Sequence, residues 1–264
     1  MATFVNELVN TLAIRWREVD VLLETAKGEE GKSDAHLHDV LCRASVVLIV
    51  AHLEGFVRDC ARAVLKDINH FSTFQGSPGH LKWTFCSTFI HTKEGGGDNQ
   101  VKKLITLLDG LQTKFAPEPF LFEGKHDDSR NPSPAVIEKI AKNFGIKGFF
   151  ALMASSRADV VFTNVNSDVA NLTNELYSHL LNHTVTFPYT VDVRHFGLDV
   201  AGDIVKDSRT LWEAFLDNLL TKRHEIAHGS DRLNSMSIGE IRTAKAKAII
   251  LQYAFAIMLC KYSV

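Results

Sequence analysis

Seven consecutive residues near the C-terminus bring together side chains that can handle protons, phosphates or a metal ion: Arg223-His224-Glu225-Ile226-Ala227-His228-Gly229. Two motifs overlap in this segment. The first is an arginine followed five positions later by a histidine, Arg223 and His228. The second is a pair of histidines four positions apart, His224 and His228, with Glu225 directly after the first. Each motif predicts its own chemistry.

The histidine pair is the pattern of a zinc hydrolase. On a helix, His224 and His228 share one face and can chelate a zinc ion, with Glu225 as the general base. A catalytic zinc also needs a third protein ligand. Asn234 stands where a third histidine would be expected, and Glu240 belongs to a predicted helix cap. We therefore expect no metal and no other cofactor, and His224 and His228 are metal ligands only in the alternative of a zinc hydrolase.

The arginine–histidine pair suits metal-free cleavage of RNA, in which a 2′-hydroxyl attacks the neighbouring phosphate. Histidine exchanges protons near neutral pH, and a guanidinium matches phosphate oxygens. His228 is expected to be the base and Arg223 to hold the phosphate, which leaves a 2′,3′-cyclic phosphate end. Five residues along a helix span about 7.5 Å and about 140°. One helix therefore does not direct both groups at one phosphate, whereas a two-fold dimer can.

Helices are expected on both sides of this segment. Apolar residues recur every three or four positions from 208 to 228, and Gly229 is suited to end that helix. Ser237 and Glu240 form a capping box, which predicts the start of a final helix. The active segment is thus expected to lie at the C-terminal end of the penultimate helix.

The N-terminal part of the chain predicts two more long helices, over residues 4–26 and 36–69. Residues 45–55 of the second are nearly all apolar, so that helix should lie near the centre of the fold. Shorter helices are expected over 99–111, 134–145 and 167–181. The segments with mixed signals are the loop at 116–134, residues 159–163 as helix or strand, and a weak strand at 187–193 that contains Pro188.

These elements predict one all-α domain over residues 1–264, a bundle of long helices with less regular insertions at about 70–130 and 149–205. The chain has 264 residues and a formal net charge of -2, so it is not a polycation, and any RNA contact requires a local basic patch. No secretion signal or membrane span is expected, because the N-terminus lacks a basic and apolar leader and residues 248–260 are too short to cross a bilayer. We expect a cytoplasmic protein without membrane contact.

The cysteines support this localisation. None is part of a CxxC pair, and each lies in an apolar, mostly helical context where a free thiol behaves as a small hydrophobic group. The pattern is typical of a reducing compartment. We therefore expect four buried, inert thiols: Cys42, Cys60, Cys86 and Cys260.

The segment from Arg223 to Gly229 resembles the Rx4-6H motif of the HEPN superfamily, in its form of arginine, polar residue and then Ile-Ala-His-Gly. The sequence Leu53-Glu54-Gly55-Phe56 resembles a signature in the central helix of the MAE or RiboL-PSP-type HEPN branch, and residues 138–146 resemble another segment of that branch. Together the similar stretches cover about residues 36–66, 130–148 and 208–262.

This resemblance implies a HEPN-like helical bundle with Arg223 and His228 as catalytic residues. His224 takes the polar motif position, where asparagine is commoner. The resemblance also implies a homodimer with both motifs in one cleft, and a metal-independent endoribonuclease of toxin–antitoxin or anti-phage defence systems. RNA is then the substrate, and an antitoxin or a nucleotidyltransferase is a candidate partner. A non-catalytic module that binds nucleotide, RNA or a protein remains the alternative.

Further candidate residues lie around the motif. Glu54 is either an accessory acid of the site or an ordinary partner of Arg58 one turn on. Lys222, Arg242 and Lys245 are candidates for binding the RNA backbone, although a solvated helix face explains them equally well. For Lys247 the solvated face is the favoured interpretation.

Several other features are expected to be structural. His52 is interpreted as a core histidine, and the pair His179 and His183 lacks further ligands for a metal. The aromatic residues between 71 and 89 are expected in the core, with stacking on RNA bases as the alternative. The polar loop at 124–131 either selects substrate or lies on the surface, and the sequence leaves that choice open.

Overall fold

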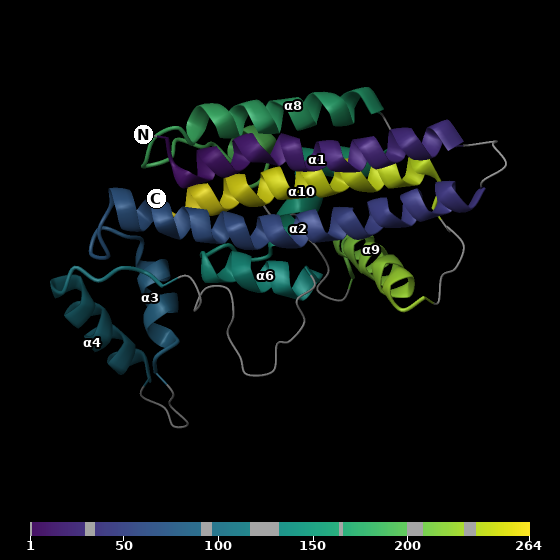
Figure 1. Ribbon diagram of the computed structural model, residues 1–264. Helices are drawn as coiled ribbons and strands as arrows, with labels where there is room; N and C mark the ends of the chain where they lie inside the picture. The colour runs from purple at the N-terminus through teal and green to yellow at the C-terminus, as the bar shows by residue number, and fades with distance from the viewer. Residues whose placement is uncertain are drawn as a thin grey trace.

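The computed structural model describes residues 2–29, 35–90, 97–116, 132–163, 166–199, 208–229 and 236–264 (Figure 1). This part of the chain is helical almost throughout and contains no β-strand. The predicted all-α class is therefore confirmed.

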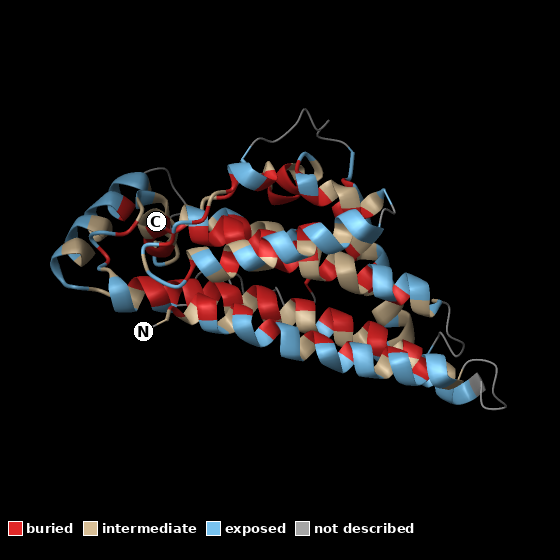
Figure 2. Cartoon of the chain, turned by 90° about the horizontal axis from the view of Figure 1, so that it is seen from above, coloured by how far each residue is buried: buried red, intermediate tan, exposed pale blue. Residues whose placement is uncertain are grey.

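Four long helices run side by side and form the body of the molecule (Figure 1). They are α1 (Phe4–Glu29), α2 (Ala35–Phe71), α8 (Asn166–His183) and α10 (Ile238–Tyr262). Each begins and ends within a few residues of the position that its apolar spacing predicts. Figure 2 shows that their buried residues face one another while the exposed residues point outward.

The most deeply buried helix is α10, in which every residue from Ile250 to Cys260 is buried. A helix that is apolar on all sides requires neighbours on all sides, and α10 contacts α1, α2 and α8. Its one buried amide, Gln252, is fully engaged: it accepts a hydrogen bond from the Trp16 indole at 3.0 Å and donates one to the His52 carbonyl at 3.0 Å. The sequence predicted a central place for α2, which contacts α1, α10 and α9.

Two of these helices, α2 and α10, are long and apolar enough to cross a membrane by length and composition. The most apolar window of α10 is 72% buried inside the fold, and that of α2 is 44% buried. Core helices of proteins that never enter a bilayer meet the same criterion.

Shorter helices pack around this body. They are α3 (Gly79–Ser87), α4 (Gly97–Gly110), α6 (Pro134–Asn143), α7 (Phe149–Ala154), α9 (Leu211–Ala227) and the 3-10 helices η1 (Arg157–Phe162) and η2 (Arg194–Phe196). Helices α3 and α4 pack on each other at one end of the molecule, and α9 packs against α2, α6 and α7 (Figure 1). The helix that carries the motif segment is thus held by elements from three other parts of the chain.

The structure decides points that the sequence left open in the middle of the chain. Of the two interpretations of 159–163, the helical one holds for most of the segment, which belongs to η1. The predicted helix over 167–181 is confirmed as α8, and α7 and η1 precede it. By contrast, residues 187–193 contain no regular element and include a cis peptide bond before Pro188.

A buried carboxylate near the end of α2 joins three segments of the chain at one end of the helical body. Asp67 accepts hydrogen bonds from the backbone N–H groups of Phe4 and Val5 at 2.8 and 3.1 Å, and from the Tyr189 hydroxyl at 2.6 Å. It therefore satisfies free donors at the start of α1, and burial raises the pKa of its carboxyl. The four cysteines are buried and form no disulfide, as predicted.

Candidate active site

Helix α9 carries the motif, and its start is fixed by a capping box. Thr210 accepts a hydrogen bond from the Glu213 N–H at 3.2 Å, while the Glu213 carboxylate accepts from the Thr210 N–H at 2.9 Å. The buried face of the helix consists of Trp212, Leu216 and Leu219. These residues are spaced by four and three positions, and a further step of four leads from Leu219 to Arg223 on the same face of the helix. Arg223 is half-buried.

The end of α9 lies inside the motif. The last helical residue is Ala227, and His228 is the C-cap residue, with its N–H donating to the His224 carbonyl at 3.0 Å. Gly229 follows with φ +68°, a left-handed conformation that disfavours any residue with a Cβ atom. The prediction that Gly229 ends this helix is confirmed, and His228 consequently projects from the helix terminus.

The three motif side chains differ in their surroundings. His224 and His228 are exposed, and their ring centroids lie 4.1 Å apart at an interplanar angle of 48°. Arg223 lies on the inner stripe instead. Within the described part of the chain, no hydrogen bond or ion pair engages the side chains of Arg223 or His228. A protomer therefore brings the two histidines together, but it does not bring Arg223 into contact with either.

A third metal ligand does not join the histidine pair among the described residues, which contain no group of three His, Cys, Asp or Glu side chains able to hold a metal. Glu240 is engaged elsewhere: its carboxylate accepts hydrogen bonds from the Ser237 N–H at 2.7 Å and the Ser237 hydroxyl at 2.8 Å. The predicted capping box is thus confirmed. Asn234 lies outside the described residues.

The accessory role suggested for Glu54 receives no support. Its carboxylate pairs with the Arg58 guanidinium at 3.0 Å, one turn along α2, which is the structural interpretation that the sequence offered. The side chains of both residues are 22% exposed. The pair therefore belongs to the surface of α2.

The cations proposed to bind RNA are each paired with a carboxylate. Lys222 contacts Glu225 at 3.1 Å, and Arg242 contacts Glu24 of α1 at 2.6 Å. Lys245 pairs with Asp20, also on α1. Arg242 and Lys245 thus link α10 to α1.

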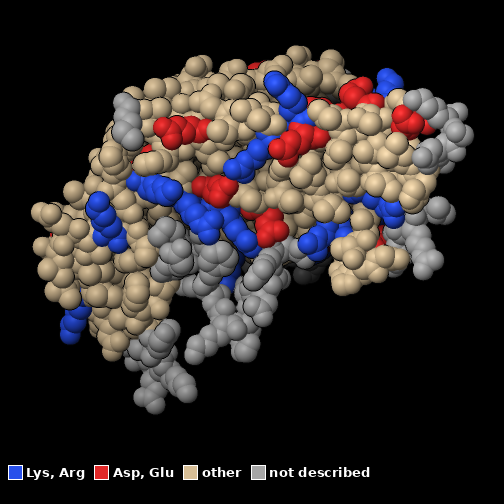
Figure 3. Space-filling view, viewed as in Figure 1, with Lys and Arg blue, Asp and Glu red and all other residues tan. Residues whose placement is uncertain are grey.

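Basic and acidic side chains also alternate on the face shown in Figure 3, where basic residues form a broken line interrupted by acidic ones. This mixture agrees with a net charge near zero. Any RNA contact on this face consequently depends on a few residues and not on a continuous basic track.

Two other histidines that the sequence singled out, His52 and His179, have structural surroundings. His52 is largely buried, with its ring edge-to-face against Trp16 at 5.4 Å. His179 accepts a hydrogen bond from the Asp192 N–H at 3.0 Å, so the nitrogen that would bind a metal is engaged. Burial and the neighbouring His183 and His195 lower the pKa of His179 to about 4.

The aromatic residues between 71 and 89 are mostly core, as expected. Phe74 and Phe85 are buried and pack on Phe115 with ring centroids 4.9 and 5.3 Å away. Phe71 and Phe89 are exposed, by 38% and 56%. The loop at 124–131, for which the sequence left two interpretations, lies outside the described residues.

A family model described as RiboL-PSP-HEPN matches residues 10–261, which include the whole motif segment and all the helices that support it. The chain belongs to the RiboL-PSP-HEPN family. The resemblance inferred from the motif and from α2 is thereby confirmed. No curated protein and no solved structure matches this chain.

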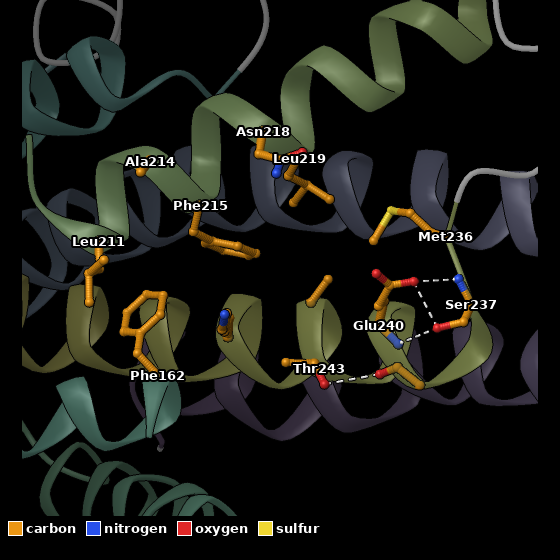
Figure 4. A pocket seen from close by; sticks show the side chains of 13 residues that line it. Phe162, Leu211, Ala214, Phe215, Asn218, Leu219, Met236, Ser237, Glu240 and Thr243 are labelled. Carbon is orange, nitrogen blue, oxygen red and sulfur yellow. Dashed lines mark hydrogen bonds between the residues drawn. The ribbon is translucent and has the colours of Figure 1, made fainter. Parts of the chain in front are cut away.

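Sequence reasoning missed one feature of this RiboL-PSP-HEPN protein. A cavity of about 650 Å³ lies between α9 and α10, and Phe162, Phe215 and Lys247 are among its lining residues (Figure 4). The solvated face favoured for Lys247 is wrong, because its ammonium group lies over two aromatic rings. The apolar sequence around Lys247 was a signal, since a lysine there must share its helix turn with buried residues.

Proposed function

We propose that this protein is a metal-independent endoribonuclease of the HEPN type, with Arg223 and His228 as its catalytic residues. The observation that carries the proposal is the state of these two side chains. An imidazole projects from the terminus of α9, and the same helix carries the Arg223 guanidinium, which forms no ion pair with any residue that the structure describes. The match to the RiboL-PSP-HEPN family over the whole segment supports the same chemistry.

The proposed reaction uses the RNA's own 2′-hydroxyl as nucleophile. His228 takes the proton of that hydroxyl, and the 2′-oxygen forms a bond to phosphorus while the bond from phosphorus to the 5′-oxygen breaks. Arg223 stabilises the negative charge that develops on the phosphate oxygens. The leaving 5′-oxygen takes a proton from water, so the products carry a 2′,3′-cyclic phosphate and a 5′-hydroxyl. His224, next to His228, contributes to the shape and polarity of the site.

We further propose that the active form is a homodimer. Arg223 lies on the inner stripe of α9 and His228 at its exposed terminus, and about 140° of rotation separates two positions that are five residues apart. A two-fold axis close to the end of α9 brings the Arg223 of one protomer near the His228 of the other. The two-fold axis produces two such pairs in the cleft, and each pair holds one phosphate between its arginine and its histidine.

A toxic RNase requires restraint, so we place this protein in a defence or toxin–antitoxin system in the cytoplasm, with an antitoxin or nucleotidyltransferase as its partner. The paired surface cations favour a substrate recognised at the site itself. Single-stranded RNA meets that requirement, because its bases and phosphates are accessible to a small number of side chains.

A cleavage assay tests the proposal. The purified protein is incubated with single-stranded RNA, with and without EDTA, and product ends are analysed for a cyclic phosphate. We expect cleavage that EDTA leaves unchanged, and a loss of about 100-fold or more in Arg223→Ala and in His228→Ala. Matched controls are Arg17→Ala and His195→Ala, which remove exposed residues on α1 and η2 and should retain full activity.

The possible results separate the alternatives. Cleavage abolished by EDTA would indicate the zinc hydrolase. Binding of RNA without cleavage would indicate a non-catalytic module. Cleavage that persists in both Arg223→Ala and His228→Ala would show that the site is elsewhere.

A further inference from the structure

The cavity between α9 and α10 is lined by apolar and aromatic side chains on one part of its wall and by polar ones on the rest (Figure 4). Phe215 and Leu219 line it from α9, Phe162 from the end of η1, and Met236 from the residue before the α10 cap. Its volume of about 650 Å³ lies within the range of pockets that bury a small organic ligand. The cavity therefore has the size and lining of a binding site.

Lys247 places one positive charge in this apolar surrounding. Its ammonium nitrogen lies 4.3 Å from the ring centroid of Phe162 and 5.6 Å from that of Phe215. Interactions with ring faces hold the ammonium group in place, but they do not neutralise it. Among the described residues Lys247 has no carboxylate partner, and burial lowers its pKa.

The other charged residue of the lining does not neutralise Lys247. Glu240 lies two turns before it on α10, and its carboxylate accepts hydrogen bonds from the Ser237 N–H and hydroxyl. By comparison, the neighbouring cations Arg242 and Lys245 both have carboxylate partners on α1. Among the described residues Lys247 is thus a cation of the cavity wall that no carboxylate neutralises.

We propose that this cavity binds a small aryl carboxylate, with the carboxylate on the Lys247 ammonium and the ring against Phe215 and Leu219. A single cation matches a single negative charge, and the Glu240 carboxylate repels a second one, which disfavours polyphosphates. An apolar ring fills the rest of the lining and removes its surface from water. This site is separate from Arg223 and His228, and it does not depend on the proposed ribonuclease activity.

Binding measurements with a matched pair of ligands test the proposal. The probes are 2-naphthoate and the neutral 2-naphthalenemethanol, titrated into the full chain by calorimetry. We expect the wild type to bind the carboxylate about tenfold more tightly than the alcohol, as a charge-assisted hydrogen bond provides. Lys247→Met, which keeps the length of the side chain, should bind both probes with equal affinity. Lys245→Met is the matched control and should keep the tenfold preference.

Two further measurements keep the test decisive. Ala214 lines the cavity from α9 and is exposed, so Ala214→Trp should block both probes while leaving the thermal unfolding midpoint nearly unchanged. The preference for the carboxylate should also fall as rising pH removes the proton from Lys247. Equal binding of both probes by the wild type, binding of neither, or a preference that survives in Lys247→Met would each overturn the proposal.

Discussion

The sharpest prediction concerns which protomer supplies each catalytic group. Arg223 lies on the inner stripe of α9, whereas His228 lies one residue beyond the helix at its exposed end. Positions five residues apart on a helix differ by about 7.5 Å along the axis and about 140° around it. We therefore expect each active site to use the Arg223 of one protomer and the His228 of the other.

Mixing two inactive variants tests this arrangement. In a dimer of one Arg223→Ala chain and one His228→Ala chain, one of the two sites combines an intact arginine with an intact histidine. Statistical exchange at equal concentrations makes half of the dimers mixed, so the mixture should recover about a quarter of the wild-type activity. If both groups of a site came from one protomer, every site in the mixed dimer would lack one of them and the activity would stay at the level of the parents.

The assay compares initial rates of cleavage of an end-labelled single-stranded RNA before and after the subunits are exchanged by dilution from denaturant. Native mass spectrometry establishes that mixed dimers have formed. A mixture of His228→Ala with the double variant lacks His228 altogether and serves as the inactive control. Mixed dimers without recovered activity would refute the shared site, and a monomer at all concentrations would refute the dimer itself.

Three other predictions concern stability and titration. Gly229→Ala forces a Cβ atom into a left-handed backbone with φ +68° and should lower the free energy of unfolding by about 1–2 kcal/mol. The control Gly28→Ala, at the end of α1 where no atom lies within 4 Å of an added Cβ, should not lower it. Equal effects of the two substitutions in urea titrations would contradict the capping role of Gly229. The imidazole of His179 should titrate near pH 4 by NMR, below the ordinary pKa of 6.5. Between these two pH values the unfolded state binds more protons than the folded state, so stability falls as pH falls from 6.5 to 4. A titration midpoint near 6.5 would contradict the burial of His179. Asp67→Asn removes one acceptor from a buried group with three donors and should lower the free energy of unfolding by about 1–3 kcal/mol. Because the pKa of Asp67 is raised above 3.8 in the folded state, the contribution of the Asp67 carboxyl to stability falls as pH rises from 3.8 to that folded-state pKa. A difference in unfolding free energy between the two proteins that does not change with pH would refute this.

The helices of this protein could be predicted closely because their signals are local. Apolar spacing predicted α1, α2, α8 and α10 within a few residues, and the pairs that cap a helix lie only three positions apart, as Ser237 and Glu240 do. The middle of the chain was harder. Val160 and Val161 in η1 are β-branched, which favours a strand, but this segment packs against α8 and α10 as a short 3-10 helix.

The candidate catalytic residues were also within reach of the sequence, since Arg223, His224 and His228 form one continuous motif. The sequence could not predict which of the surrounding charged side chains form ion pairs. Arg242 pairs with Glu24 and Lys245 with Asp20, across more than 200 positions of the chain. No pattern within α10 reveals which of its cations a distant helix will neutralise.

The sequence by itself thus determined the helical class, the end of α9 at Gly229 and the motif on that helix, because hydrogen bonds and apolar spacing within a few residues govern all three. Only the tertiary structure decided that, within the part of the chain it describes, Arg223 and His228 make no side-chain hydrogen bond or ion pair while Arg242 and Lys245 are paired. It also decided that α9 and α10 enclose a cavity with Lys247 in its wall. The physical reason is that ion pairs and cavities arise where surfaces from distant segments meet, and that meeting is set by the packing of the whole bundle.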